Sequence, residues 1–268
     1  VLVLALLGRV ILNPAVTDND LILSESKTAR VLLLTAHPDD ECLFFAPTVS
    51  SLLTPPSTSH LSERNVELYS LCLSIGNAGG LGEVRRDELA RSLSVLGIPE
   101  TRRWLVDHPE LPDNITRSWD ADVIADTIKP YVLANNITTI LTFDRDGISS
   151  HPNHGSLPAG AARLVASLST ASPTRPPPRL FSLITVQLVH KYIGPLSAVL
   201  AKYDLIFASL LRRYGMDSPR RMPVFISGIE GYKTALRAMM QHRSQLVWFR
   251  WLYVSFSRYL WVNEWVQV

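Results

Sequence analysis

Two short segments concentrate side chains that can bind a metal ion or transfer a proton. Residues 36–41 read Ala-His-Pro-Asp-Asp-Glu, and residues 144–154 end in His-Pro-Asn-His after two aspartates. Either segment alone has a simple explanation, because acidic residues favour helix N-termini and histidines are common in surface loops. Together they hold more acid–base and metal-binding groups than helix capping needs, and they indicate a hydrolytic metal site.

The spacing of His37 and Asp40 suits a single metal ion. The two residues are three apart, so their side chains can converge at the entrance of a helix. Catalytic zinc sites use three protein ligands from His and Asp or Glu, together with a water molecule. A histidine of the second segment would complete this set. Such an ion lowers the pKa of its water to roughly 7, and other divalent ions fit the same ligands.

The remaining groups can transfer protons. Asp39 is the spare carboxylate and can accept a proton from the attacking water. A histidine that does not bind the ion can stabilise an oxyanion and protonate a leaving amine, and such help is typically worth about 10²–10⁴ in rate. A metal ion with these acid–base groups indicates a hydrolase of amides or similar carbonyl compounds. The groups do not indicate which substrate is hydrolysed.

Apolar strand patterns come directly before both segments. Residues 31–34 are Val-Leu-Leu-Leu, a short continuous run typical of a buried strand, and residues 137–143 are rich in Ile and Thr. In a parallel α/β sheet, ligands bind beyond the carboxyl ends of the strands. We therefore expect both segments to project from the same edge of one sheet.

Strand and helix patterns alternate along most of the chain. Further strands are predicted over residues 66–75, 102–106, 180–186 and 224–227, and helices over residues 40–53, 83–96, 119–133, 154–168, 196–213 and 232–246. This alternation predicts an α/β fold with a mostly parallel sheet and helices on both faces.

The two segments resemble the motifs of a known family. Residues 36–41 and 151–154 look like the two motifs of the PIG-L/LmbE-like zinc deacetylases, and the similarity extends over about residues 30–245. The resemblance implies a Rossmann-like fold and removal of acetyl from N-acetylglucosamine-type sugars.

The same resemblance assigns roles within the motifs. His37, Asp40 and His154 match the family's metal ligands, which implies zinc as the cofactor. Asp39 matches the general base, and His151 matches the histidine beside the oxyanion.

Three further residues match the family less closely. Arg85, in Gly-Glu-Val-Arg-Arg-Asp-Glu, is expected either to reach a substrate hydroxyl or phosphate, or to form a surface pair with Glu88. His242 begins a His-Arg-Ser-Gln segment that resembles one near the family's site. Asp144 is expected either to hydrogen bond His151 and fix its tautomer, or to be a turn residue.

One position distinguishes branches of the family. Many bacterial members carry Asp between the two histidines, where this chain has Asn153. The Asn form resembles the eukaryotic branch, which acts on N-acetylglucosaminyl-phosphatidylinositol in GPI-anchor synthesis. Members of that branch are anchored in the endoplasmic reticulum membrane by one N-terminal helix, with the catalytic domain facing the cytosol. The resemblance therefore implies a glycolipid substrate at a membrane surface.

Both ends of the chain are apolar. Residues 1–23 begin with a run shorter than the roughly 20 residues that a membrane span needs, and we expect them to be the remnant of a membrane anchor with its linker. Residues 24–247 are the expected catalytic domain. Residues 248–268 combine Trp, Tyr and Phe with Arg, which suits either a membrane interface or a helix packed on the core.

The composition and the distribution of charge bear on the class of partner. The 268 residues are 47% hydrophobic with a net charge of +2, and basic residues are scattered, so no nucleic-acid partner is expected. Cys42 and Cys72 are expected to be buried, reduced thiols.

Two competing interpretations remain. One is a deacetylase of a soluble N-acetylglucosamine conjugate. The other is a non-catalytic α/β scaffold or a nucleotide-binding domain, supported by the Gly-rich residues 76–82. The spacing of these glycines matches no phosphate-binding motif, and the complete set of metal-binding and acid–base residues favours an enzyme.

Overall fold

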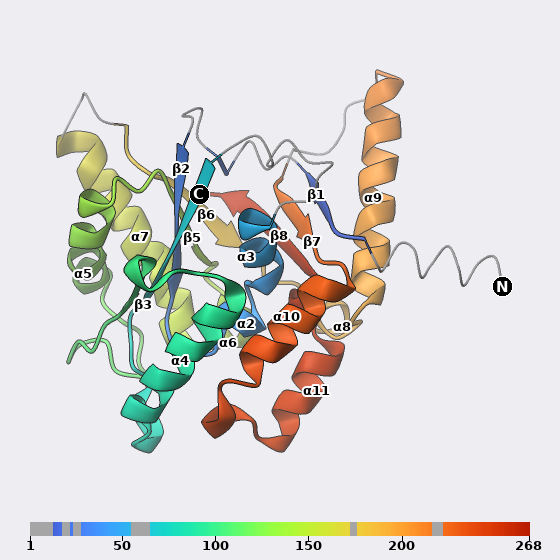
Figure 1. The fold of residues 1–268 in the computed structure, drawn as a ribbon. Helices are drawn as coiled ribbons and strands as arrows, with labels where there is room; N and C mark the ends of the chain where they lie inside the picture. Colours follow the sequence, from blue (N-terminus) through green and yellow to red (C-terminus); the bar gives the residue numbers. More distant parts are fainter. Residues whose placement is uncertain (1–12, 18–21, 24–27, 55–64, 172–175, 216–221) are drawn as a thin grey trace.

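One mixed sheet forms the centre of the molecule. The computed structural model describes the chain except for residues 1–12, 18–21, 24–27, 55–64, 172–175 and 216–221. Within the described residues, eight strands pair in the order β1-β7-β8-β6-β5-β2-β3-β4 (Figure 1). Their bounds are β1 Ala15–Thr17, β2 Thr28–Thr35, β3 Asn65–Cys72, β4 Arg103–Leu105, β5 Thr139–Phe143, β6 Arg179–Leu183, β7 Val224–Ile226 and β8 Val262–Gln267.

The parallel half of the sheet holds the predicted strands except the one over residues 224–227, which is the antiparallel strand β7. Strands β4, β3, β2, β5 and β6 run parallel to one another, whereas β8, β7 and β1 join by antiparallel pairing. The buried runs of β2 and β5 lie side by side, with Val31 opposite Thr139 and Leu33 opposite Leu141. The expected α/β fold with a mostly parallel sheet is confirmed.

Helices surround this sheet (Figure 1). Helices α3, α4 and α10 pack together on one face, and α5 and α7 pack together on the other. The bounds are α2 Asp40–Leu43, α3 Ala46–Leu53, α4 Gly82–Leu96, α5 Ala121–Ala134, α6 Gly147–Ser150, α7 Pro152–Ala171, α8 Leu188–Lys191, α9 Leu196–Arg213, α10 Ile229–Met239 and α11 Trp248–Phe256. Short 3-10 helices span Asn77–Gly79, Glu100–Arg102, Arg243–Gln245 and Arg258–Leu260.

The helix predicted over residues 40–53 is two helices. Helix α2 ends at Leu43, and α3 begins at Ala46 with Pro47 in its first turn. Proline has no N–H to donate and would clash with the carbonyl of Leu43 in a continuous helix, but it fits the start of a new one. The break lets residues 36–43 form a separate tight turn beside the sheet.

The C-terminal residues 248–268 divide between surface and core. Helix α11 exposes Trp248 and Phe249, whereas Tyr259 and Trp265 are almost fully buried. Strand β8, which the sequence did not predict, lies between β6 and β7 in the sheet. Asn263 masks the strand's apolar pattern, because this polar side chain is buried and hydrogen bonds to Thr48 and to the carbonyl of Phe44.

The helix predicted over residues 232–246 is shorter. Helix α10 spans Ile229–Met239, and a 3-10 turn spans Arg243–Gln245. Ser244 donates from its backbone N–H and its hydroxyl to the Glu88 carboxylate at 2.8 and 2.6 Å. These bonds to α4 draw the chain out of the helical path.

Both cysteines have the predicted state. Cys42 and Cys72 are free and buried.

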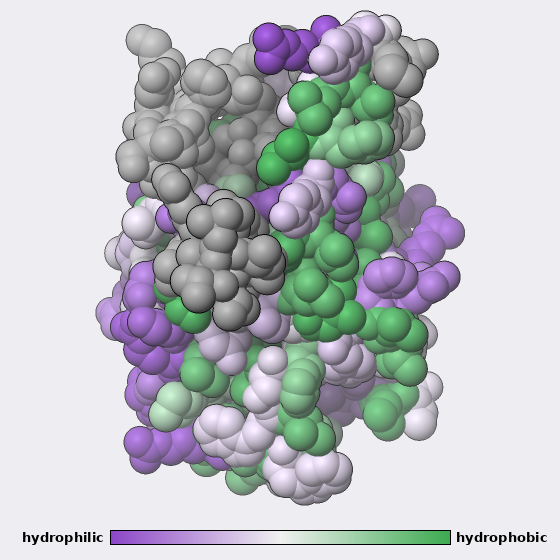
Figure 2. Space-filling view, turned by 90° about the vertical axis from the view of Figure 1, so that its right-hand side faces the viewer, coloured by the Kyte–Doolittle hydropathy of each residue, from purple (hydrophilic) through white to green (hydrophobic). Residues whose placement is uncertain are grey.

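The apolar start of the predicted membrane anchor, residues 1–12, lies outside the described residues. No helix in the described part of the chain has both the length and the apolar character to cross a membrane. Exposed apolar side chains instead gather over one side of the molecule, around α9 and α11 (Figure 2).

Candidate active site

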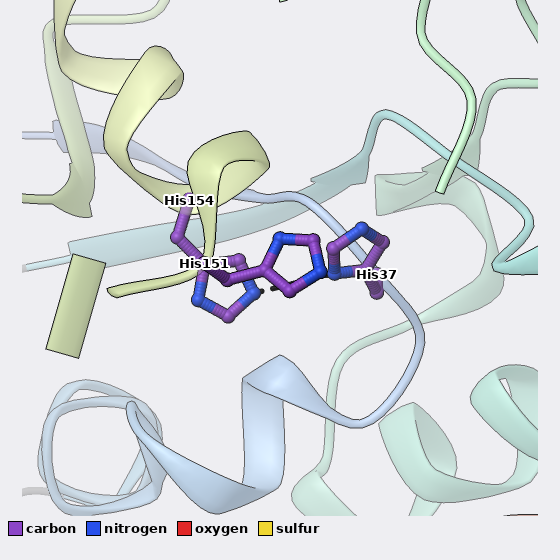
Figure 3. Close-up of side chains that lie close together, drawn as sticks. All are labelled: His37, His151 and His154. Carbon is purple, nitrogen blue, oxygen red and sulfur yellow. Dashed lines mark hydrogen bonds between the residues drawn. The ribbon is translucent and has the colours of Figure 1, made fainter. Parts of the chain in front are cut away.

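Two loops bring the predicted site residues together at one edge of the sheet. Residues 36–40 follow β2, and residues 144–151 follow the neighbouring parallel strand β5. Because the carboxyl ends of parallel strands lie at the same edge, these loops meet as the sequence predicted. The imidazoles of His37 and His151 from these loops and of His154 from the first turn of α7 face one another, with a nitrogen of each within 4.8 Å of the others (Figure 3).

The three predicted metal ligands converge on one point. Nε2 of His154 lies 3.2 Å from Nδ1 of His37 and 3.2 Å from Oδ1 of Asp40. The other carboxylate oxygen of Asp40 accepts the backbone N–H groups of Ala36 and His37 at 3.0 and 2.9 Å. These bonds fix the carboxylate so that Oδ1 faces the imidazoles.

Hydrogen bonding sets the tautomer of His154. Its Nδ1 lies 3.1 Å from the carbonyl oxygen of Gly147, which can only accept. Nδ1 of the neutral ring therefore carries the proton, and Nε2 presents a lone pair. Gly147 must be glycine here, since its φ is +58° and an added Cβ would lie 2.7 Å from the Cβ of His154.

Hydrogen bonding also sets the tautomer of His37. Its Nε2 faces two acceptors, Oδ1 of Asn153 at 3.1 Å and Oδ1 of Asp113 at 3.3 Å. Nε2 therefore carries the proton, and Nδ1 presents its lone pair to His154. Burial lowers the pKa of His37 to about 4, which keeps the ring neutral near pH 7.

This donor set fits a divalent cation. Two imidazole lone pairs and one carboxylate oxygen point at one another, an arrangement that repels without a positive charge among them. Burial alone would raise the pKa of Asp40, but the facing His154 and His37 outweigh it and lower that pKa. Burial likewise acts to lower the pKa of His154, and the Asp40 carboxylate outweighs it and raises that pKa. A positive charge at this point, either a proton on Nε2 of His154 or a metal ion, removes the repulsion between the lone pairs.

His151 differs from the other two histidines. Its Nδ1 accepts the backbone N–H of Asn153 at 3.3 Å, so the proton of the neutral ring lies on Nε2. That N–H points to the same space as the ligands, with Asp113 Oδ1 at 3.8 Å. Burial, followed by the proximity of His154, lowers the pKa of His151. In this tautomer His151 is a hydrogen-bond donor, as its expected role beside an oxyanion requires, although its ring also lies within the group of three histidines.

Asp39 lies beside the ligands in a strained backbone conformation. Its φ is 110° and its ψ is −20°, a left-handed region that costs a residue with a Cβ. Arg250 donates to its Oδ2 at 2.9 Å, and Nη2 of Arg85 lies 3.9 Å from its Oδ1. Burial raises the pKa of Asp39, although the two guanidinium groups act to lower it.

A buried network behind Asp39 holds this conformation. Oε2 of Glu41 accepts the backbone N–H of Asp39 at 3.0 Å, and Oε1 lies 2.7 Å from Nε2 of His242. Ser92 donates to the same Oε1 at 2.5 Å. His242, predicted near the site, is thus a fully buried partner of Glu41. Its Nδ1 has no hydrogen-bond partner among the described residues.

Arg85 is buried, so the alternative of a surface pair with Glu88 is wrong. Its guanidinium donates to the carbonyls of Pro38 at 2.6 Å and Gly76 at 3.0 Å, and to Oδ2 of Asp113 at 3.2 Å. Gly76 has a φ of +71° and leaves room for this side chain. Arg85 therefore joins the Gly-rich loop to the turn that carries Asp39.

The predicted hydrogen bond from Asp144 to His151 is absent in the described structure. The Asp144 carboxylate instead accepts the N–H and the hydroxyl of Thr185, both at 2.6 Å, and the N–H of Gly147 at 3.0 Å. The second interpretation, a turn residue, fits these contacts. They hold the loop in which Ile148 has a φ of 61°, and this conformation is costly for a β-branched residue.

Known proteins of one family are similar to this chain in sequence. The family described as PIG-L: GlcNAc-PI de-N-acetylase matches residues 32–165. The N-acetylglucosaminyl-phosphatidylinositol de-N-acetylase of Bos taurus is 37% identical over 236 residues, which cover 88% of this chain and 82% of the bovine protein. The chain belongs to the PIG-L family. A probable enzyme of the same name from Dictyostelium discoideum is 31% identical, over 89% of this chain and 93% of that protein.

Solved structures share the PIG-L fold at low sequence identity. The N,N'-diacetylchitobiose deacetylase of Pyrococcus horikoshii has a TM-score of 0.55 at 17% identity, covering 89% of this chain and 83% of that one. The hydratase GalB of Pseudomonas putida has a TM-score of 0.53 at 13% identity, covering 90% of this chain and 96% of that one. Because a hydratase shares the fold, the fold alone does not decide the reaction.

Two residues of the site in this PIG-L chain were not predicted from the sequence. Asp113 contacts His37 and Arg85, and Arg250 contacts Asp39. Asp113 lies in an irregular loop with no pattern around it. Arg250 had one usable signal, since it is a charged residue within the apolar helix α11.

Asn153 supports the loop beside His37 in this PIG-L chain. Its Oδ1 accepts from the backbone N–H of Asn114 and faces His37, while its Nδ2 donates to the carbonyl of Arg117 at 2.7 Å. An ionised Asp could not make the donation to Arg117. The amide thus fixes the loop around Asp113 next to a predicted metal ligand.

A cavity of about 760 Å³ opens above these groups. The predicted ligands, Asp39 and His151 lie on its wall, together with Arg85 and Asp113. Aromatic and aliphatic side chains of α11 form another part of the wall, among them Phe249, Leu252 and Phe256. A polar floor and an apolar wall suit a ligand that is polar at one end and apolar at the other.

Proposed function

We propose that the chain hydrolyses the N-acetyl group of N-acetylglucosaminyl-phosphatidylinositol, giving glucosaminyl-phosphatidylinositol and acetate in GPI-anchor biosynthesis. The observation that carries this proposal is the convergence of His37 Nδ1, His154 Nε2 and Asp40 Oδ1 in a cavity that also holds a buried carboxylate and an imidazole donor. The 37% identity to the bovine de-N-acetylase supports the choice of substrate.

His37, Asp40 and His154 would hold the metal ion, and zinc suits their nitrogen and oxygen atoms. When bound, such an ion polarises the amide carbonyl and makes water a stronger nucleophile. Asn153 and Gly147 orient the two imidazoles from behind through their oxygen atoms. This support keeps the ligand atoms aimed at one point before any ion arrives.

The chain's own side chains then move the protons. Asp39 accepts a proton from water as the water oxygen bonds to the amide carbon. His151 Nε2–H donates a hydrogen bond to the developing oxyanion. When the C–N bond breaks, the departing amine takes up the proton, and acetate remains. The guanidinium of Arg250 holds the Asp39 carboxylate in place at 2.9 Å.

Substrate recognition uses the two sides of the cavity. Arg85 and Asp113 form a buried ion pair at 3.2 Å beside the ligands, and such a pair suits sugar hydroxyl groups. The apolar wall of α11 suits the lipid end of the molecule. We therefore propose the membrane of the endoplasmic reticulum as the place of work, with the catalytic domain on its cytosolic side.

Product analysis tests the proposal. The purified chain is incubated with N-acetylglucosaminyl-phosphatidylinositol and, separately, with a water-soluble N-acetylglucosamine conjugate, and acetate and free amine are measured. We expect release of both products in equal amounts from the glycolipid. Equal turnover of the soluble conjugate would favour the soluble-substrate enzyme, and no release from either would contradict the proposed reaction.

A further inference from the structure

Helix α9 exposes an apolar stripe to solvent. Leu196, Leu200, Tyr203, Phe207 and Leu210 are each between 45% and 63% exposed. Their spacing of three or four residues places them on one side of the helix. Its opposite side packs on β7 and β8, with Ala198 and Ala201 buried. The stripe is therefore not needed for packing within the described fold.

Helix α11 exposes a second apolar surface. Trp248, Phe249, Trp251, Leu252 and Phe256 are each between 46% and 75% exposed. Soluble monomers rarely expose contiguous apolar patches larger than a few hundred Å², and larger patches mark interaction sites. Trp and Tyr rings, with one polar end and an apolar body, are enriched where water meets lipid.

The two surfaces join through the link after α8. Gly194 donates its N–H to the carbonyl of Phe256 at 2.8 Å, and the rings of Tyr192 and Tyr253 lie 6.2 Å apart. Figure 2 shows apolar residues in a band down this side of the molecule, with hydrophilic residues mainly toward its edges. We call the exposed apolar residues of α8, α9 and α11, together with Tyr192, the apolar face.

The apolar face reaches the mouth of the cavity. Tyr192, Phe249 and Leu252 are each at least 42% exposed and also line the cavity. A ligand that leaves the metal centre toward this wall therefore meets the apolar face before it meets open solvent.

Helix α9 adds a small positive charge to the apolar face. Its Lys202 and Arg213 are at least partly exposed, and Asp204 is the one acidic residue of α8, α9 and α11. Lys191 of α8 is buried and Arg250 of α11 pairs with Asp39, so neither adds to this surface charge. Basic residues beside a lipid-facing surface are attracted to anionic headgroups such as phosphatidylinositol.

We infer that the apolar face lies flat on an anionic lipid bilayer, with the mouth of the cavity at the bilayer surface. This inference rests on the proposed glycolipid substrate and adds the surface through which that substrate enters. Helix α9 has 18 residues and would lie along the membrane over about 27 Å. The sugar headgroup then reaches the metal centre while the acyl chains stay in the bilayer.

A pair of double variants tests this inference. Phe207→Ser with Leu210→Ser removes two exposed side chains of the stripe, neither of which lines the cavity. Leu133→Ser with Val84→Ser is the matched control, because these side chains are 37% and 47% exposed on α5 and α4, outside the apolar face. Binding is measured by flotation with vesicles of phosphatidylcholine and phosphatidylinositol. Turnover is measured on water-soluble N-acetylglucosaminyl-inositol phosphate.

We expect the lipid concentration for half-maximal binding to rise about tenfold or more in the α9 variant and to stay within about twofold in the control. Turnover of the soluble substrate should be equal in both. An α9 variant that binds vesicles as tightly as the unmodified chain overturns the inference. So does an unmodified chain that binds no vesicles and forms a dimer that the variant separates, since the face then joins two copies.

The experiments distinguish a failure of the proposed reaction from a failure of the proposed membrane-docking surface. If the unmodified chain releases no acetate from any substrate but its vesicle binding still depends on Phe207 and Leu210, the proposed reaction is wrong and the docking surface stands.

Discussion

Arg250 of α11 donates to the carboxylate of Asp39 at 2.9 Å, across 211 positions of the sequence. The helix with the exposed aromatic side chains thus also contacts the proposed general base. This bond links the wall of the cavity to its reacting centre. It gives α11 two functions, one at the surface and one at the site.

Replacing Arg250 by Met should shift the pH dependence of turnover. Arg250 acts to lower the pKa of Asp39, so its loss raises that pKa further above the ordinary value. A general base must be ionised, and the acid limb of kcat/KM should therefore move to higher pH. The profile is measured with a water-soluble substrate, so that membrane binding does not enter.

Arg86→Met is the control for this change, since Arg86 pairs with Glu83 on the exposed side of α4. Its profile should match that of the unmodified chain. An Arg250→Met profile whose acid limb stays in place would show that Arg250 does not control the ionisation of the base.

Replacing Asp39 by Asn should separate metal binding from turnover. Asn keeps the shape of the side chain but cannot accept the proton, and we expect a loss of about 10²–10⁴ in kcat. Bound metal, measured by elemental analysis, should be unchanged, because Asp39 is not among the converging ligand atoms. Near-normal turnover would mean that another group is the base.

Replacing His154 by Ala should remove both metal and activity. Its Nε2 is the atom that lies 3.2 Å from both other ligand atoms, so the variant keeps two of the three ligands and loses the one that lies between them. His108→Ala is a suitable control, since His108 is partly exposed in a loop and does not line the cavity. Metal content and acetate release are measured on both proteins. Full metal binding by the His154 variant would disprove the ligand assignment.

The sequence predicted the parts of the site that follow regular elements. His37, Asp40 and His154 lie after or near the ends of two strands with clear apolar patterns, and the pairing of those strands brings them together. Asp113 and Arg250 have no such pattern, and only tertiary contacts place them in the cavity.

The fold was predictable to a similar extent. The parallel strands were found because each holds a short run of apolar or β-branched residues, and the run in β2 is unbroken over Val31–Leu34. Strand β8 was missed because Asn263 interrupts its pattern and aromatic residues surround it. The break between α2 and α3 could have been predicted from Pro47, whose missing N–H ends one helix and favours the start of another.

Replacing His242 by Ala should destabilise the fold. His242 and Glu41 are both fully buried and lie 2.7 Å apart, so the variant leaves a buried carboxylate without its partner. We expect the free energy of unfolding to fall by about 3–5 kcal/mol. Urea unfolding measures this loss, with His108→Ala as the control. A loss under about 1 kcal/mol would mean that water or another group replaces the imidazole.

Acetate release from N-acetylglucosaminyl-phosphatidylinositol, with and without a metal chelator, tests the central claim most directly. The account predicts release by the purified chain, loss of release on chelation, and its return when zinc is added back in stoichiometric amount. Release that continues at the full rate after the metal has been removed, as verified by elemental analysis, would contradict the assignment of His37, Asp40 and His154 as a catalytic metal centre.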